Sequence, residues 1–208
     1  SRENDRTFSW TWNNILTYDK TLGEHHFNLL AGQEAYSYRY DVLRASRSNM
    51  ALPDFPELAV GSLVTGGTGY RVNYSLVGYF LNAQYDYQSK YFFSGSYRRD
   101  GSSRFAPETR WGNFWSVGAS WRIDREDFMV ATSDWLSALT LKVSYGAQGN
   151  DNLGTYYASS GLYSVVSNNG ENALVSDRLA TPKLKWETNL NFNAGIDFSL
   201  FNNRFSGS

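Results

Sequence analysis

Residues 186–199 read WETNLNFNAGIDFS, and this stretch decides the fold. Nearly all its even positions are apolar and its odd positions carry polar side chains or glycine, and this period of two predicts a β-strand with one apolar and one polar face. At about 3.3 Å per residue and a tilt of about 40°, the stretch rises about 33 Å, enough to cross the hydrocarbon of a bilayer. We therefore expect lipid-facing side chains at Trp186, Leu190, Phe192, Ile196 and Phe198, and side chains facing a water-filled lumen at Asn189, Asn191, Asn193 and Asp197.

Similar alternation recurs along the chain, at residues 7–18, 25–31, 77–86, 91–98, 115–123 and 139–146. Together with a new start near Arg204, these stretches indicate about eight strands. The predicted fold class is all-β, a segment of an antiparallel transmembrane β-barrel with long outer loops, in which residues 1–208 form part of one barrel domain.

The connections between these strands alternate in length. Residues 19–24, 86–90 and 199–203 read as short turns, whereas residues 39–69, 100–110 and 149–182 read as long polar segments. Membrane barrels show this alternation, with short periplasmic turns and long outer loops. Residues 124–137 fit less well, because they replace an expected short turn with a segment that reads as a brief helix.

Composition narrows the function classes. The net charge of −1 gives no electrostatic case for nucleic acid, and the absence of cysteine excludes disulfides, thiol catalysis and cysteine metal sites. Aromatic residues make up 17% of the chain and gather near the ends of the predicted strands, at Tyr85, Tyr87, Tyr91, Trp111, Trp115 and Trp121. They indicate the interfacial girdles of a barrel, or simply residues that favour strands.

No motif predicts catalysis or a resident cofactor. His25 and His26 are adjacent and should point to opposite faces, so they cannot easily share a metal. Residues 65–69 (TGGTG) lack the lysine of a phosphate loop and read as a flexible loop. Residues 149–154 (GNDNLG) could hold Ca²⁺ at an outer loop, or form an ordinary turn. No carboxylate pair or Ser–His–Asp arrangement is evident, so we expect no enzyme.

Five residues are candidates for substrate contact. Arg99, Asp100 and Arg104 could form a charged cluster at the base of a loop, or could only stabilise the local turn. Tyr156 and Tyr157 lie in a long polar segment, where paired aromatic rings suit stacking on sugars, or the packing of the loop on itself.

Several segments, in this order, resemble the SusC/RagA family of TonB-linked outer-membrane transporters. They are YRRDGSSRF (97–105), RWGNF (110–114), SVGASWRI (116–123), DWL (134–136), LKVSYGAQG (141–149), LKWETNLNFNAGID (184–197) and FNNRFSGS (201–208). The resemblance covers residues 76–208 well and residues 1–75 only in general character.

The resemblance implies a barrel of about 22 strands in the bacterial outer membrane, of which this chain would supply about eight, without the plug domain. It further implies TonB-energised import of glycans or peptides. The expected partners are a SusD-like surface lipoprotein, the TonB machinery through the missing plug, the remaining barrel strands and the lipid bilayer. The alternative is a soluble antiparallel β-sandwich that acts as a carbohydrate-binding module through exposed tryptophan and tyrosine.

Overall fold

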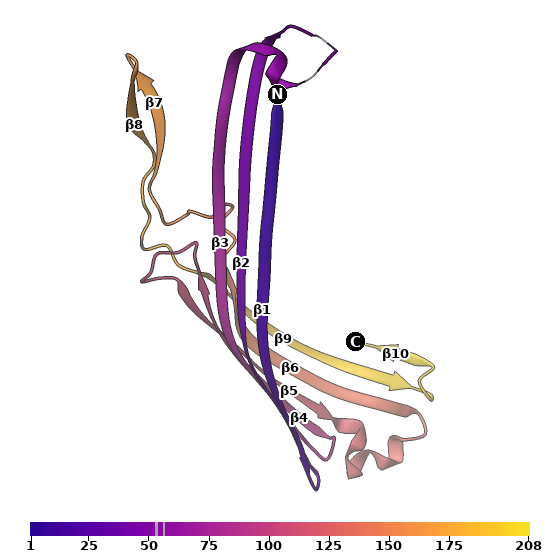
Figure 1. Ribbon diagram of the computed structural model, residues 1–208. Helices are drawn as coiled ribbons and strands as arrows, with labels where there is room; N and C mark the ends of the chain where they lie inside the picture. The colour runs from indigo at the N-terminus through magenta and orange to yellow at the C-terminus, as the bar shows by residue number, and fades with distance from the viewer. Residues whose placement is uncertain (53, 56) are drawn as a thin grey trace.

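The structure, a computed structural model, describes residues 1–52, 54–55 and 57–208. Most of these residues belong to long antiparallel strands (Figure 1). The strands are β1 (Arg2–Leu22), β2 (His25–Met50), β3 (Gly61–Tyr87), β4 (Tyr91–Ser102), β5 (Trp111–Arg122), β6 (Leu136–Asn150), β7 (Leu162–Asn168), β8 (Glu171–Arg178), β9 (Glu187–Leu200) and β10 (Phe205–Gly207). Three short 3₁₀ helices are η1 (Leu58–Val60), η2 (Ile123–Arg125) and η3 (Asp127–Thr132).

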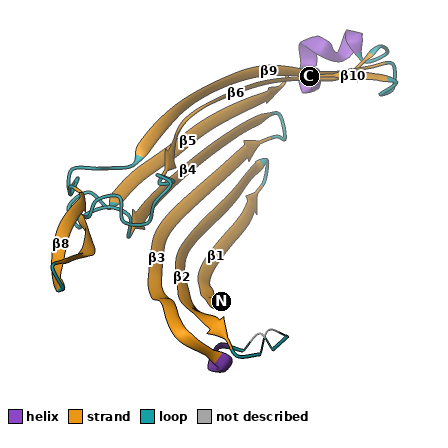
Figure 2. Ribbon diagram, turned by 90° about the horizontal axis from the view of Figure 1, so that it is seen from above, coloured by secondary structure: helices purple, strands orange, loops and turns teal. Residues whose placement is uncertain are grey.

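Eight of these strands form one antiparallel sheet in the order β1-β2-β3-β4-β5-β6-β9-β10, and β7 and β8 form a separate hairpin. The sheet is curved and open, with β1 and β10 at its edges (Figure 2). The predicted antiparallel all-β fold and its eight strands are confirmed. The alternative of a β-sandwich is wrong, because the described residues contain one large sheet rather than two sheets packed face to face.

The register carries the predicted faces from strand to strand. Val117 pairs with Tyr145, which in turn pairs with Phe192, so that apolar and aromatic side chains of neighbouring strands lie side by side on one face. We call this side the apolar face, and its exposed side chains include Trp10, Leu81, Phe93, Tyr97, Val117, Leu141, Leu190 and Phe192. The opposite side is the polar face, which carries Asn82, Gln84, Ser94, Ser96, Ser116, Ser144, Asn191 and Asn193.

The expectation of a long loop at residues 39–69 is wrong. β2 continues to Met50 and β3 begins at Gly61, so these two strands, together with β1, run far beyond β4, β5, β6 and β9 (Figure 1). The glycine-rich residues 65–69 are therefore strand and not a flexible loop. The alternation of apolar and polar residues is weak in this part of β2 and β3, so periodicity did not predict these strands. The backbone pairing of β1 with β2 and of β2 with β3 nevertheless continues.

Residues 149–182 also contain more structure than a polar loop. They include the β7–β8 hairpin, whose turn is formed by Asn169 and Gly170 with φ of 51° and 90°. Positive φ at both central residues fits a tight hairpin turn, and the Asn-Gly pair is its strongest sequence signal. That dipeptide could have predicted the hairpin.

The connection from β5 to β6 is helical, as predicted for residues 124–137, but it forms the two 3₁₀ helices η2 and η3. Within the described residues, no helix has the length and apolarity that a membrane crossing would need. Buried apolar side chains are few among the described residues: Val42, Phe105, Phe114, Leu136 and Ala158. The sheet is therefore a wall with two exposed faces rather than the cover of a central core.

Candidate functional site

The polar face of the sheet is hollowed into a groove near the ends of β4 and β6 and the starts of β5 and β9. The groove has a volume of about 600 Å³. Its polar lining includes Ser96, Arg98, Asp100, Ser144, Asn191 and Asn193. Of the predicted lumen-facing residues, Asn191 pairs with Gly146 and Asn193 with Ser144, which places them on this face beside small side chains. Their contact with water stays a prediction.

Four of the five predicted lipid-facing residues lie together on the apolar face. The exposed fractions are 62% for Leu190, 67% for Phe192, 53% for Ile196 and 41% for Phe198. That this face meets lipid stays a prediction.

Trp186 departs from the expected row. It precedes β9 and packs against Phe105 and Phe114, with ring centroids 5.5 and 5.2 Å away. Its indole Nε1 donates to the backbone oxygen of Arg110 at 2.8 Å. Trp186 therefore closes a small aromatic core at the base of the loops. Strand alternation did not predict this position, because Trp186 lies one residue before β9 begins.

Aromatic side chains form a row near each end of the apolar face. Tyr91 stacks on Tyr87 and Trp121 at 6.3 and 6.4 Å, and Tyr79 stacks on Trp111 at 6.3 Å at the other end. Trp111 and Trp121 bound β5 ten residues apart, which corresponds to about 25 Å along the barrel axis and matches the apolar band of membrane barrels. The structure thus has the geometry of two girdles. Trp115 lies between the two rows, against Tyr145.

A cluster of polar and aromatic side chains ties the long connections to the sheet. We call Tyr74, Ser102, Arg104, Asp151 and Tyr156 the loop-base cluster. Asp151 Oδ2 accepts hydrogen bonds from the Tyr74 hydroxyl at 2.8 Å and the Ser102 hydroxyl at 2.7 Å. Arg104 donates to the backbone oxygen of Asp151 at 2.7 Å, and its guanidinium carbon lies 4.8 and 5.0 Å from the ring centroids of Tyr74 and Tyr156. The cluster therefore joins β3, the end of β4 and the segment after β6.

The other candidate contact residues are not brought together. Asp100 is buried and accepts two 2.7 Å hydrogen bonds from Arg98 Nε, whereas Arg99 lies on the apolar face, 5.2 Å over the Trp111 ring. Tyr157 packs on β3, where its hydroxyl accepts from the Asn73 backbone N–H at 3.1 Å. These contacts stabilise the base of the loops. Substrate contact by Arg99, Asp100, Arg104, Tyr156 or Tyr157 stays a prediction.

Sequence reasoning missed the tyrosines that receive the loop. Tyr38 stacks on Tyr156 at 6.0 Å, and Tyr74 lies 5.7 Å from the same ring. The signal was the repeat of tyrosine at positions 36, 38 and 40, which places three rings on one face of a strand.

The oxygens of the predicted calcium loop already accept hydrogen bonds from the protein. Asn152 Oδ1 accepts from Arg104 at 3.2 Å, and Asn150 Oδ1 accepts from the Asn152 backbone N–H at 2.9 Å. Among the described residues, no group of three or more histidine, cysteine or acidic side chains gathers around a common point. Calcium binding here stays a prediction.

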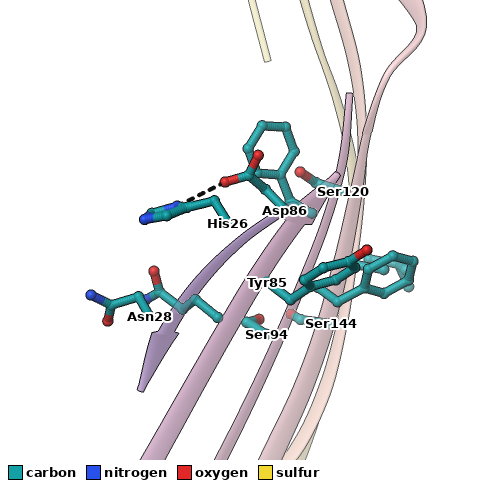
Figure 3. Close-up of a pocket in the computed structure, with 13 residues that line it drawn as sticks. His26, Asn28, Tyr85, Asp86, Ser94, Ser120 and Ser144 are labelled. Carbon is teal, nitrogen blue, oxygen red and sulfur yellow. Dashed lines mark hydrogen bonds and ion pairs between the residues drawn. The ribbon is translucent and has the colours of Figure 1, made fainter. Parts of the chain in front are cut away.

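A second hollow, of about 350 Å³, lies on the polar face at the end with short turns (Figure 3). His26 Nδ1 lies 3.0 Å from Asp86 Oδ2, and His26 Nε2 lies 3.1 Å from Asp19 Oδ2. His25 points to the other face, where Nδ1 lies 2.8 Å from the Tyr85 hydroxyl. The prediction that the two histidines diverge is confirmed.

Known proteins share this arrangement over nearly the whole chain. The TonB-dependent receptor SusC of Bacteroides thetaiotaomicron is 31% identical over 208 residues, 96% of this chain and 20% of that protein. TonB-dependent receptor P39 of Formosa agariphila is 34% identical over 94% of this chain and 19% of its own length. The solved RagAB peptide transporter matches 98% of this chain and 23% of its own chain, with 29% identity and a TM-score of 0.91.

The chain thus spans about a fifth of the length of these curated relatives. The family model described as "TonB dependent receptor-like, beta-barrel" matches residues 1–208. The chain belongs to the TonB-dependent receptor β-barrel family, of the SusC/RagA type.

Proposed function

We propose that this chain is part of the wall of an outer-membrane transporter that imports glycans or peptides with energy supplied through TonB. The observation that carries the proposal is the two-faced sheet of eight strands, which aligns with the RagAB transporter at a TM-score of 0.91. In a bilayer every backbone polar group must be paired, so a wall of this kind functions only when further strands complete the barrel.

The two faces divide the work of a transporter. The apolar face would contact lipid, and the polar face, with its serine and asparagine side chains, would line the path of the cargo. The loop-base cluster would hold the outer connections in place above that path. No bond of the cargo is made or broken in this account, in keeping with a family of transporters rather than enzymes.

The proposed partner is a SusD-like surface lipoprotein that covers the outer loops. The support for this partner is family membership alone. SusC and the RagAB transporter are similar to this chain, and the SusC/RagA resemblance implies a SusD-like lipoprotein. The RagAB relative is described as a peptide importer with "closed-closed" and "open-open" states. For this chain, glycans and peptides remain the two proposed classes of cargo.

An uptake assay tests the proposal. Cells that carry the full-length protein and cells that lack it receive fluorescently labelled oligosaccharides or peptides, with and without a proton-gradient uncoupler. We expect one cargo class to enter only cells with the protein and only without uncoupler. Equal uptake in both cell types for both classes would contradict transport, and uptake that ignores the uncoupler would contradict TonB energy.

A further inference from the structure

The connection between β5 and β6 exposes large apolar side chains at the end of the sheet with short turns. Phe128 and Val130 of η3 are 66% and 68% exposed, and Trp135, just before β6, is 47% exposed. Phe201 and Phe205, around the turn from β9 to β10, are 50% and 64% exposed. We call these five residues the turn-end patch. Water is an unfavourable environment for so many large apolar side chains in one place.

The patch is held together by contacts between its two connections. The Phe201 backbone N–H donates to the Trp135 backbone oxygen at 2.8 Å, which joins the β9–β10 turn to the segment after η3. The rings of Phe201 and Phe205 meet edge to face at 6.3 Å. Trp135, Phe201 and Phe205 therefore lie beside one another, and Phe128 and Val130 precede Trp135 on the same β5–β6 connection.

Glu126 fixes this surface to the apolar face of the sheet. Its Oε1 accepts hydrogen bonds from the Tyr91 hydroxyl and from Trp121 Nε1, the latter at 2.9 Å. Those hydrogen bonds, the one from Tyr91 first, hold the pKa of the Glu126 carboxyl below its ordinary value. Tyr91 and Trp121 belong to the aromatic row at the lower edge of the apolar band. The turn-end patch is thus continuous with the side of the sheet that faces away from the lumen.

We propose that the turn-end patch docks into the headgroup and upper acyl region of the periplasmic phospholipid leaflet. Tryptophan favours that interface, and exposed phenylalanine and valine side chains are stabilised when acyl chains cover them. Lys90 Nζ lies 3.5 Å from Glu126 Oε2, and Arg125 donates to the Ser89 backbone oxygen at 3.2 Å, so both neighbouring cations are held within the protein. The connection also carries Asp124, Asp127 and Asp134, so its attraction to the membrane comes from its apolar side chains and not from charge.

A protein in the lumen would approach from the polar face, which carries His26 and Asp86, and not from this side. The patch would therefore anchor the barrel wall at the membrane interface and so fix the depth and tilt of the strands in the bilayer. The proposal rests on the proposed function to the extent that it needs the barrel to lie in a membrane.

The experiment uses the full-length protein in vesicles of phosphatidylethanolamine and phosphatidylglycerol. Single fluorophores are attached at Phe128→Cys or Val130→Cys, with Asp134→Cys as the polar control on the same connection and Val117→Cys as the control on the wall. Quenching by brominated lipid is compared with quenching by iodide in the water. We expect lipid to quench the labels at 128 and 130 several-fold more than the label at 134, from shallow bromine positions.

Three results would overturn the proposal. If iodide reaches positions 128 and 130 as well as it reaches 134, while lipid still quenches position 117, the patch does not dock although the wall lies in the membrane. If lipid fails to quench position 117 as well, the proposed function fails with it. If both quenchers are excluded from position 128 in native outer membranes but not in vesicles, a protein covers the patch. Since Phe128 and Val130 are exposed, their labelled forms should fold, and the heat-modifiable gel mobility of each variant verifies this.

Discussion

Replacing Val117 with arginine should destabilise the folded barrel far more than the same change at the neighbouring Ser116. Val117 lies on the apolar face, four residues from Trp121 in a band of ten residues that ends at Trp111. Four residues correspond to about 10 Å of a band of about 25 Å, so Val117 lies near the middle of the proposed membrane. An arginine there costs about 2–4 kcal/mol, which lowers the ratio of folded to unfolded protein about 30- to 700-fold.

Ser116 provides the matched control. Its side chain lies on the polar face, where its hydroxyl shares a 2.6 Å hydrogen bond with Ser96, and the Ser116→Arg change places the charge in the lumen at the cost of about 1 kcal/mol for that hydrogen bond. Urea midpoints of the full-length variants, refolded in lipid vesicles, give the comparison. A Ser116→Arg variant that loses as much stability as Val117→Arg would refute the assignment of the two faces.

Three further predictions concern the ends of the strands. Because the pKa of Glu126 is below its ordinary 4.5, its hydrogen bonds stabilise the fold above that pH and are lost as the pH falls below it. Thermal midpoints should therefore drop as the pH falls through about 4.5 and on through the lowered pKa of Glu126, less so for Glu126→Gln. The Gly149→Ala change should cost about 1–3 kcal/mol because its new methyl group would overlap the Phe114 ring, whereas Gly195→Ala meets open space and should stay within about 0.5 kcal/mol in urea unfolding. The Arg104→Ala change should expose residues 151–160 to added protease without loss of heat-modifiable mobility. Equal cleavage of the variant and the wild-type protein would show that Arg104 does not hold this segment in place.

The strands and their faces could be predicted wherever one face is apolar. Residues 186–199, 115–123 and 139–146 alternate cleanly, and each became a strand with the predicted parity. Periodicity failed at residues 39–69, because apolar side chains fall on both faces of β2 and β3 there. Val42 and Leu43 are adjacent, as are Leu63 and Val64, so the two faces do not contrast. What defines those strands is pairing with neighbours, from Arg2↔Ala45 to Met50↔Gly61, and pairing is not visible in a local pattern.

The candidate site was harder to predict than the fold. Arg104 and Tyr156 were singled out from the sequence, and the structure brings them together. The acceptor that organises them, Asp151, contacts Tyr74 across 77 residues of sequence and Ser102 across 49. Contacts over such separations follow from the curvature and register of the sheet, which no local motif encodes. The β5–β6 connection departs from the pattern of short turns already in the sequence, and it supplies Phe128, Val130 and Trp135 of the turn-end patch.

The most direct test of the central claim is the environment of two adjacent residues of β9. Single labels at Leu190 and Asn191, in the full-length protein in native outer membrane, are compared for access to a lipid-soluble and a water-soluble quencher. The account predicts that lipid quenches the label at Leu190 and that the water-soluble agent quenches the label at Asn191, since adjacent strand residues point to opposite faces. If both labels meet water, or if neither meets lipid, the sheet is not the wall of a membrane barrel.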